Sequence, residues 1–509
     1  MNALRNFMPT LTPISNTPSA TPRARLDSSG WLLGALALWL LATLGLRPLL
    51  LPDEGRYANV AREMLLGNAL VPTLNGLPFF HKPPLFYWLD MAAMQVLGTN
   101  AFSARIGSMI GAWLMGASMF YSVRHWHGQR VATIALGSLA TAPFFFIGAQ
   151  YANHDMLVAG LITVAVLALV KAVEEPPQVH LGWLAAAAIA CALGVLAKGL
   201  IGGVLPALVV GPWLLAQGRW RQLLKLLHPV GLLAFAAVAA PWFVVVQLRY
   251  PGFFDYFFIE QHFRRFAQSS FNNVQPFWFF IVLFPALMLP WSVWLPQTFK
   301  RLWVGHDAYV GLYVWWVLAV VGFFSLPSSK LAGYVLPAVA PCFALLALAL
   351  AQRRGRLWQS VMGFSALLCV LIVVVFAWQA PKSNRATALA LSTRIVPGDR
   401  VVMVNDYFYD LPFYAGLTEP VIIATNWADP ELPFHDNWRK QMFEAARFDP
   451  ARGRELLWPV DRLDALVCGN GTVWFVVRPG ETHLLTGVSG IARVFGGPNT
   501  ELWRAAARR

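Results

Sequence analysis

Long runs of hydrophobic residues, separated by short polar segments, fill the chain up to about residue 378. A helix needs roughly 20 mainly apolar residues to cross the hydrocarbon core of a membrane, and these runs have about 17 to 22. The pattern predicts an all-α polytopic membrane domain of about 11 to 13 transmembrane helices. The clearest runs lie at 31–51, 101–123, 130–149, 155–172, 180–197, 200–216, 227–248, 276–296, 309–326, 331–350 and 357–378.

The polar segments between these runs differ in charge. If the N-terminus is cytoplasmic, every short loop with clustered Arg and Lys falls on the cytoplasmic side, as the positive-inside rule requires. We therefore predict an inner-membrane protein in which residues 1–30, rich in Thr, Pro and Ser, form a disordered cytoplasmic tail. The basic residues of these loops are Arg124, Arg130, Arg219, Arg221, Lys225, Lys300, Arg301, Arg353, Arg354 and Arg356.

Acidic residues gather on the opposite, periplasmic side. This side has two long loops, at 52–100 and 249–275, and the stretches 56–66 and 85–97 predict helices that lie along the membrane surface. Charged side chains are costly near the bilayer centre, so their concentration on one face indicates a polar cavity that opens to the periplasm. The carboxylates are Asp53, Glu54, Glu63, Asp90, Asp155, Asp255 and Glu260, and the cations are Lys82, Lys198, Arg264, Arg265 and Lys330.

A different pattern follows the last long apolar run. Residues 400–404, 420–424 and 472–477 are short apolar segments separated by Asn, Pro and Gly turns, which is typical of buried strands. We predict that 379–509 form a small periplasmic α/β domain after the membrane domain at 31–378. Its aromatic residues either line an acceptor groove or belong to the domain core, and no chemistry is assigned to them. They are Tyr407, Tyr409 and Trp427.

Composition supports a membrane protein and removes one class of partner. Hydrophobic residues make up 57% of the chain and charged residues only 13%, against about 25% charged residues in soluble domains. The net charge is +14, but residues 383–509 contain 14 acidic and 14 basic residues. The positive excess therefore belongs to the membrane loops, where it sets the topology, and no nucleic-acid partner is expected.

Candidate chemistry is densest in the first outer loop, which contains PDEGRY at 52–57 and NGLPFFHKPPLFYW at 75–88. Further motifs follow in order: NHD at 153–155, AKG at 197–199, PWF at 241–243, EQHFRRF at 260–266 and SKLAGYVLP at 329–337. In these motifs the chain resembles the aminoarabinose transferases of lipid A and, more distantly, the protein O-mannosyltransferases. The resemblance implies a GT-C fold and inverting transfer of a sugar from a polyprenyl phosphate on the periplasmic side.

The resemblance also implies roles for individual residues. Asp53 corresponds to the carboxylate that contacts or deprotonates the acceptor, and Asp155 corresponds to a carboxylate at the catalytic cavity. Capping of a helix is the alternative for both. Lys82 corresponds to the residue that contacts the donor phosphate. Tyr334 either lines the cavity or anchors the protein at the membrane interface.

Electrostatics independently favours cations near the donor phosphate. The reaction breaks the bond between the anomeric carbon and a phosphate oxygen, so negative charge grows on the leaving phosphate and nearby cations stabilise the transition state. Arg56 and Arg265 are further candidates, because a guanidinium can hold two phosphate oxygens at once. Of the other charged residues, Glu54 is expected to face water, and Lys198 is expected to mark a helix end and extend toward the interface.

A metal site is a further expectation from the resemblance. The aminoarabinose transferases bind zinc near the donor phosphate through the Glu of an F-E-K-P-P motif and a later His. Here His81 stands at the Glu position and His262 matches the His, and two imidazoles suit Zn²⁺ or another divalent cation. The substitution leaves two alternatives: the metal is lost, or Glu260 joins the site.

Together these features predict a membrane glycosyltransferase that moves a sugar from undecaprenyl phosphate to lipid A, with 4-amino-4-deoxy-L-arabinose as the candidate sugar. A protein or glycan O-glycosyltransferase of the mannosyltransferase type is the alternative, and Asp53 would then be the general base. A transporter or flippase for lipid-linked sugars is the non-enzyme alternative. It predicts charges near the middle of the spans and often inverted repeats, and the sequence shows neither.

Overall fold

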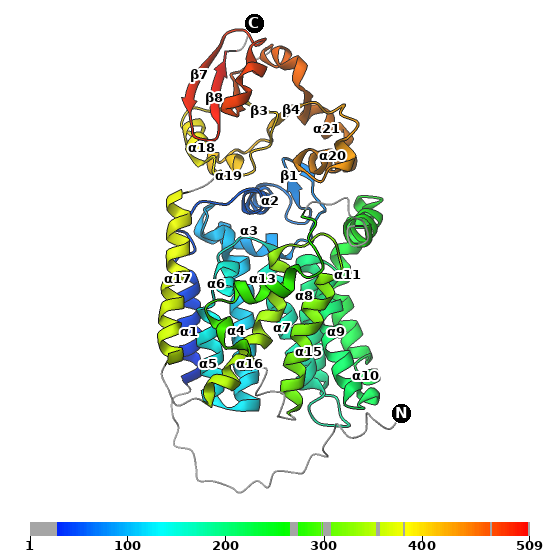
Figure 1. Cartoon of the computed structure of the whole chain (residues 1–509). Helices are drawn as coiled ribbons and strands as arrows, with labels where there is room; N and C mark the ends of the chain where they lie inside the picture. The colour runs from blue at the N-terminus through cyan, green and yellow to red at the C-terminus, as the bar shows by residue number, and fades with distance from the viewer. Residues whose placement is uncertain are drawn as a thin grey trace.

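The computed structural model describes residues 28–264, 273–296, 298, 307–352, 357–379, 382–468 and 471–506. It has three layers (Figure 1): a bundle of long helices, a thin layer of short elements across one end of the bundle, and an α/β domain above that layer. The middle layer comes from the connection that follows the first helix, so the layers do not simply follow the chain.

The bundle consists of apolar helices. Within the described ranges, seven helices are long and apolar enough to cross a membrane, and the pair α5 (Gln129–Ala140) and α6 (Pro143–Ala149), bent by 66°, would make an eighth. The prediction of a multi-pass helical membrane protein is confirmed. The seven are α4 (Ile106–His127) with the preceding turn η2 (Ser103–Arg105), α7 (His154–Ala172), α8 (Leu181–Lys198), α11 (Pro229–Arg249), α15 (Ala308–Ser325), η5 (Ala332–Ala338) joined to α16 (Val339–Ala351), and α17 (Leu357–Gln379).

The sequence predicted more spans than this count, and the difference lies in short or broken helices. α1 (Ser28–Leu41) and α9 (Ile201–Ala216) are apolar but shorter than the other spans. The apolar run at 276–296 is interrupted after α13 (Phe279–Leu287), in a turn that contains Pro290. Proline lacks the amide hydrogen that would continue the helix, and hydropathy alone does not register this break.

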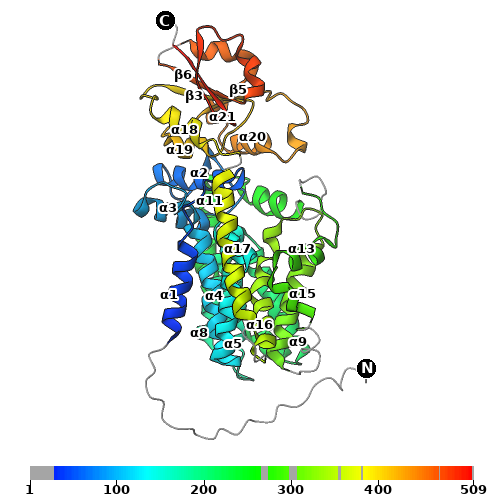
Figure 2. The same ribbon diagram turned by 60° about the vertical axis from the view of Figure 1, so that its left-hand side comes forward.

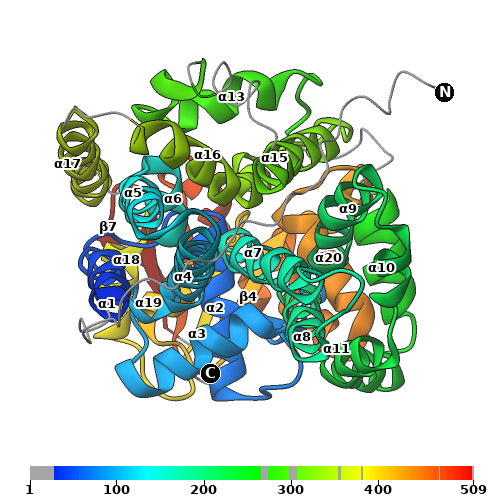
Figure 3. The same ribbon diagram turned by 90° about the horizontal axis from the view of Figure 1, so that it is seen from below.

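α4 and α7 form the centre of the bundle (Figure 3). Their backbones touch at Gly111 and Gly160, where an added Cβ atom on Gly160 would overlap the backbone of Gly111. α7 is buried along most of its length, whereas α17 packs at the outside and remains mostly exposed to the surroundings of the bundle. The close contact brings the start of α7 beside the start of α4, at the end of the bundle that faces the middle layer.

The middle layer joins α1 to α4. Its elements are α2 (Asp53–Leu66), the hairpin of β1 (Thr73–Leu74) and β2 (Leu77–Pro78), and α3 (Leu85–Leu97). α2 was expected to lie along the membrane surface, but it is enclosed between the bundle and the α/β domain (Figure 1). On the domain side, Asn59 donates a 3.3 Å hydrogen bond to the Tyr407 hydroxyl, and Arg62 donates to the Leu417 carbonyl.

The C-terminal domain is a six-stranded sheet with helices on its faces. The strand order is β5-β4-β3-β6-β8-β7, in which β5, β4, β3 and β6 are parallel and β8 and β7 are antiparallel to their neighbours. Central strand β6 is buried on both faces, as a covered parallel strand requires. The strands are β3 (Arg400–Val404), β4 (Ile422–Thr425), β5 (Leu457–Pro459), β6 (Val473–Val477), β7 (Ile491–Gly496) and β8 (Glu501–Ala505).

Helices of this domain face the middle layer. Figure 2 shows α18, α19 and α20 between the sheet and α2. The domain therefore contacts α2 through its helices rather than through a sheet edge. The domain helices are α18 (Arg385–Ser392), α19 (Leu411–Ala415), η6 (Leu432–Phe434), α20 (Trp438–Phe448), α21 (Pro450–Leu456), η7 (Val460–Val467) and η8 (Pro479–Leu485).

The membrane part has three further described elements: α10 (Trp220–Lys225), η3 (Asp255–Arg264) and η4 (Trp291–Trp294).

Candidate active site

A cavity of about 1090 Å³ lies where the bundle, the middle layer and the C-terminal domain meet. Each layer contributes polar side chains to its wall. These are Asp53, Arg56, His81 and Lys82 from the middle layer, Asp155, Lys198 and Tyr334 from the membrane helices, and Tyr407, Tyr409 and Gln441 from the domain. Residues separated by more than 300 positions in the chain thus share one space.

Asp53 is the first residue of α2 and faces the cavity. It does not cap the helix: the N-cap position is Pro52, and no side chain accepts a capping hydrogen bond there. An Asp53 oxygen instead forms an ion pair with Arg56, one turn further along α2. The capping alternative is therefore wrong for Asp53. Its carboxylate can contact a ligand bound in the cavity.

Asp155 lies on the opposite wall, in the first turn of α7. Asn153 caps this helix by accepting the Asp155 amide, so the Asp155 carboxylate has no capping role. It forms an ion pair with Lys198, whose ammonium lies 4.6 Å from the centre of the Tyr334 ring. Lys198 was expected to extend toward the interface; it instead turns into the cavity. Gly333 permits this packing, because a Cβ atom there would collide with the Asp155 carboxylate.

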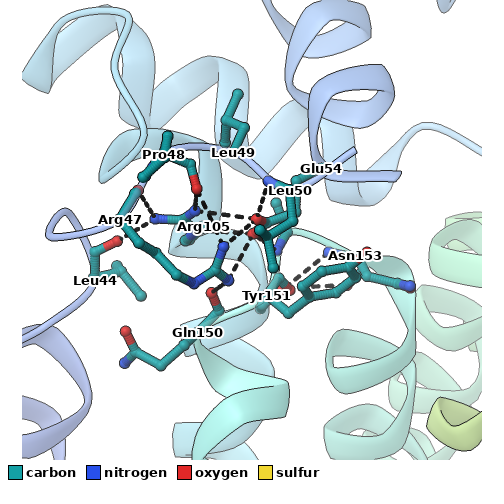
Figure 4. A network of polar contacts seen from close by, with 12 residues as sticks. Leu44, Arg47, Pro48, Leu49, Leu50, Glu54, Arg105, Gln150, Tyr151 and Asn153 are labelled. Atoms are coloured by element: carbon teal, nitrogen blue, oxygen red, sulfur yellow. Dashed lines mark hydrogen bonds and ion pairs between the residues drawn. The ribbon is translucent and has the colours of Figure 1, made fainter. Parts of the chain in front are cut away.

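Glu54, expected to face water, is fully buried. Figure 4 shows its carboxylate between two guanidiniums, those of Arg47 and Arg105. It also accepts the backbone amides of Leu50 and Ala152, each at 2.8 Å. Burial alone would raise the pKa of Glu54, but the charges of Arg105 and Arg47 outweigh burial and lower the pKa to about 2.

This network fixes the position of both candidate catalytic carboxylates. Glu54 is the chain neighbour of Asp53, and its bond to the Ala152 amide holds the turn that leads into Asn153 and Asp155. Arg47 strengthens the same link by donating to the Gln150 carbonyl at 2.6 Å (Figure 4). A buried ion network with nearly all its hydrogen bonds formed is rigid, because any change of geometry leaves a buried charge unpaired.

Lys82 and His81 occupy a third part of the wall. The Lys82 ammonium donates to the His81 carbonyl at 3.1 Å and lines the cavity. His81 stacks on Phe79, and its Nε2 lies 3.6 Å from a Glu444 oxygen of α20. Burial lowers the pKa of His81, and the Glu444 carboxylate offsets this only in part. Tyr256 also donates to Glu444, at 2.8 Å.

The structure places two possible donor atoms for the predicted metal ion beside this wall of the cavity. The Nε2 of His81 is buried, has no hydrogen-bond partner among the residues that the structure describes, and faces Glu444. A nitrogen and a carboxylate oxygen both suit zinc. Within the part of the chain that the structure describes, no three His, Cys, Asp or Glu side chains lie close enough together to hold a metal, so Glu260 is not grouped with His81. The His262 side chain and all of Arg265 fall outside the described residues.

One side of the cavity is apolar. Leu200, Ile201 and Val204, at the start of α9, face the cavity together with Phe323 and Phe324 of α15. The cavity thus combines a charged region beside the middle layer with an apolar region between two membrane helices. This combination suits an amphipathic ligand with a charged head and a hydrocarbon tail.

Comparison with known proteins shows the family to which this chain belongs. The sequence profile of the dolichyl-phosphate-mannose-protein mannosyltransferases matches residues 81–245. The undecaprenyl phosphate-α-4-amino-4-deoxy-L-arabinose arabinosyl transferase 1 of Pseudomonas fluorescens is 32% identical over 400 residues, which cover 75% of this chain and 69% of that relative. The chain belongs to this arabinosyl transferase family.

Other members of the arabinosyl transferase family match over a smaller share of their length. Arabinosyl transferase 2 of Pseudomonas fluorescens is 34% identical over 68% of this chain and 63% of its own length. The Erwinia tasmaniensis enzyme is 34% identical over 61% of this chain and 57% of its own length. The chain therefore matches less than two thirds of the length of these two relatives.

Solved structures confirm the GT-C fold. ArnT from Cupriavidus metallidurans bound to undecaprenyl phosphate has a TM-score of 0.80 at 22% identity and covers 94% of this chain and 98% of its own. The archaeal oligosaccharyltransferase AglB from Archaeoglobus fulgidus has a TM-score of 0.51 at 14% identity, over 89% of this chain and 70% of its own.

The structure brings together most of the residues singled out from the sequence. Asp53, Asp155, Arg56, Lys82, Tyr334 and His81 all line the cavity. Sequence reasoning missed the contribution of α20, which supplies Gln441 to the cavity wall and places Glu444 beside His81. The available signal was their spacing of three positions on an amphipathic helix. That spacing is common on ordinary surface helices, and it did not indicate a site.

Proposed function

We propose that the protein is a polyprenyl-phosphate-sugar-dependent inverting glycosyltransferase that moves a sugar from undecaprenyl phosphate to lipid A, with 4-amino-4-deoxy-L-arabinose as the candidate sugar. The observation that carries the proposal is the single cavity that holds two carboxylates, several cations and an apolar wall. The names of the relatives support the same donor and sugar.

The donor would bind with its phosphate beside Lys82 and Arg56 and its hydrocarbon tail along the apolar wall of α9 and α15. A lipid phosphate as ligand is supported by the structural neighbour ArnT from Cupriavidus metallidurans, which was solved bound to undecaprenyl phosphate. A lysine and a guanidinium stabilise the phosphate more as it leaves than while it is esterified, because its charge grows along the reaction. These cations therefore lower the barrier to transfer.

In the reaction, an oxygen of the acceptor attacks the anomeric carbon from the face opposite the phosphate. The new carbon–oxygen bond forms as the bond to the phosphate oxygen breaks, and the electron pair of that bond leaves with undecaprenyl phosphate. A lipid A phosphate is already anionic, and Asp53 would then orient the acceptor. A hydroxyl acceptor would give its proton to Asp53.

We further propose that the site binds a zinc ion or another divalent cation. His81 and Glu444 fit two of its ligand positions, since a buried imidazole nitrogen and a carboxylate oxygen lie 3.6 Å apart. Bound there, the ion would offset part of the phosphate charge. Elemental analysis of the purified chain should find stoichiometric zinc, and the His81→Ala and Glu444→Gln variants should lose it.

The proposal includes a location. Transfer to lipid A in the periplasmic leaflet requires the cavity and the C-terminal domain on the periplasmic side of the inner membrane, with the N-terminus in the cytoplasm. Among the described residues, the basic loops at the α4–α5 junction and at α10 lie at the end of the bundle away from the C-terminal domain (Figure 1), which supports this orientation. In a Cys468→Ser background, which removes the exposed native thiol of the domain, cysteine labelling from outside should modify a cysteine introduced at Arg504 and leave one at Gln129 unmodified.

The transfer assay uses the purified full-length protein in detergent with radiolabelled undecaprenyl-phosphate aminoarabinose and lipid A. We expect labelled lipid A from the wild type and a reduced amount from Asp53→Asn, which no longer orients the acceptor, while Asp255→Asn, a matched change at an exposed carboxylate, keeps wild-type activity. Full activity of Asp53→Asn would remove the role proposed for that carboxylate. Absence of transfer to any acceptor, with intact movement of the donor across vesicles, would favour a flippase.

A protein acceptor is a second candidate, favoured by the match of residues 81–245 to the protein mannosyltransferases. A Ser/Thr-rich peptide offered beside lipid A distinguishes the two. With a hydroxyl acceptor, loss of the base in Asp53→Asn should reduce kcat by about 10²- to 10⁴-fold. With a lipid A phosphate, which needs no base, the reduction should be smaller.

A further inference from the structure

Helix α20 of the C-terminal domain lines the cavity with Gln441, and Glu444, one turn further along the helix, contacts His81 of the cavity wall. Its first turn is fixed because the Asn437 side chain accepts the amides of Arg439 and Lys440. Gln441 begins the next turn and points to the middle layer. The helix is therefore anchored just before the residue that contacts the site.

Gln441 connects the domain to Arg56. Its Oε1 accepts a 3.0 Å hydrogen bond from Arg56 Nη1 and a 2.8 Å hydrogen bond from the Tyr409 hydroxyl. The other terminal nitrogen of Arg56, Nη2, forms the ion pair with Asp53. A continuous chain of contacts thus runs from Tyr409 through Gln441 and Arg56 to Asp53, and all four side chains line the cavity.

Arg56 is held in a fixed orientation with one donor group unused. Its guanidinium lies 4.9 Å from the centre of the Tyr57 ring and 5.7 Å from that of Tyr409. Its Nε–H is buried and has no hydrogen-bond partner among the described residues. A buried donor without a partner is destabilising, because it has lost its hydrogen bonds to water. An anionic ligand in the cavity would satisfy this group.

The domain does not need this chain of contacts in order to dock. Asn75 of the hairpin exchanges two 2.8 Å hydrogen bonds with the backbone of Val421. The Leu49 amide donates to the Tyr414 hydroxyl at 2.7 Å. These contacts lie away from the cavity wall, so Gln441 and Tyr409 are not required simply to hold the domain in place.

We propose that Gln441 and Tyr409 are positioning residues: the C-terminal domain uses them to hold Arg56 toward the phosphate of the lipid-linked donor. The inference rests on the proposed function. Without the Gln441 oxygen, both terminal nitrogens of Arg56 are free to turn onto Asp53, since a guanidinium and a carboxylate favour a two-bond pair. In this two-bond pair, Arg56 no longer contacts the donor phosphate, and the Asp53 carboxylate no longer contacts the acceptor.

The test compares donor kinetics of full-length variants. Gln441→Met removes the acceptor at nearly constant volume and should lower kcat/KM for the donor about 10- to 100-fold, the range for one lost hydrogen bond to a charged group. Part of this should appear in KM, because Arg56 already contacts the phosphate when the donor binds, and part in kcat, because the phosphate charge grows as the bond breaks. Tyr409→Phe keeps Gln441 but removes the hydroxyl that donates to its Oε1. This variant should lower kcat/KM for the donor by a smaller factor.

Two controls separate positioning from a general structural role. Tyr414→Phe deletes a hydroxyl that bonds to the middle layer outside the cavity, and it should leave the donor KM unchanged. In an Arg56→Met background, Gln441→Met should have no further effect on the donor KM, because Gln441 acts through Arg56.

Two results would overturn the inference: additive effects of Gln441→Met and Arg56→Met, or an unchanged donor KM in Gln441→Met. Either can occur in a protein whose wild type is fully active, and the proposed function would then stand. A wild-type protein that transfers no sugar would overturn the proposed function itself.

Discussion

The two ends of the helix bundle carry charged residues in different ways. At the end beside the C-terminal domain, Glu54 is fully buried and the Asp155 side chain is only 9% exposed. At the opposite end, Glu174 accepts from His125, Trp126 and Lys171 at 2.8 to 3.0 Å, but its side chain is 23% exposed.

The difference reflects what each end must do. Exposed ion pairs contribute little to stability, about 0 to 1 kcal/mol, because water competes for the same charges. Buried charges are costly unless every partner is present, so a fold keeps them where a fixed geometry matters. The cavity end therefore contains fully buried charges held in a fixed geometry, whereas the ion pairs of the opposite end are only partly buried and remain in contact with water.

The largest effect is expected from removing the central charge of the cavity end. Glu54→Gln leaves the guanidiniums of Arg47 and Arg105 buried without a counter-charge, so the free energy of unfolding should fall by about 3 to 5 kcal/mol. Denaturant unfolding in detergent, followed by tryptophan fluorescence, measures this. Glu175→Gln, at the exposed opposite end, is the matched control. Equal stability of the two variants would show that the ends do not differ.

Removing a cation of the cavity should affect turnover more than folding. Lys82→Met deletes a charge beside the proposed phosphate position and should lower kcat by about 100- to 1000-fold, as for other preorganised charge contacts. Lys171→Met deletes an ammonium at the opposite end and should leave kcat unchanged. Comparable losses in both variants would point to global damage rather than to a phosphate contact.

The pH dependence of stability distinguishes two buried carboxylates near the cavity. Asp410 accepts from Ser383 and Asn384 but has no cation among these partners, and burial raises its pKa to about 6. The folded state then holds the proton more tightly than the unfolded chain. Its contribution is fully present below pH 3.8 and is lost as pH rises through about 6, a change of about 3 kcal/mol for two pKa units.

Glu54 behaves in the opposite sense, because its pKa of about 2 lies below the ordinary value. Its contribution is present above pH 4.5 and is lost as pH falls toward 2. Unfolding curves from pH 3 to 8 for the wild type and Asp410→Asn measure the first effect. If the two proteins have parallel pH profiles, Asp410 does not titrate as stated.

The smallest effect is expected at the exposed end. Glu174→Gln removes the charge that pairs with Lys171 and His125, and the free energy of unfolding should change by less than about 1 kcal/mol. Transfer activity should match the wild type. A loss of several kcal/mol would mean that the opposite end also depends on fixed charges.

Much of the fold followed from the hydrophobic pattern. The apolar runs at 101–123, 155–172 and 357–378 correspond to α4, α7 and α17, and the short segments at 400–404 and 472–477 correspond to β3 and β6. Such segments are set by local composition. The run at 276–296 did not form one span, because hydropathy does not weigh the prolines that interrupt it.

The site was predictable only in part. The motifs around Asp53, Lys82 and Asp155 identified residues that line one cavity. Whether each carboxylate faces water, a helix end or a cation depends on its neighbours in space. For this reason Glu54 was wrongly expected to face water, and Lys198, which ends α8 as expected, was wrongly expected to extend toward the interface.

The sequence by itself determined which segments enter the membrane, where the α/β domain begins and which residue types are available for phosphate chemistry, because each depends on neighbours along the chain. Tertiary structure decided that Glu54 is buried between Arg47 and Arg105 and that Gln441 of a distant domain meets Arg56. These contacts join residues up to 385 positions apart. The physical reason is that the energy of a charge is set by the atoms packed around it, and packing brings together parts of the chain that no local pattern connects.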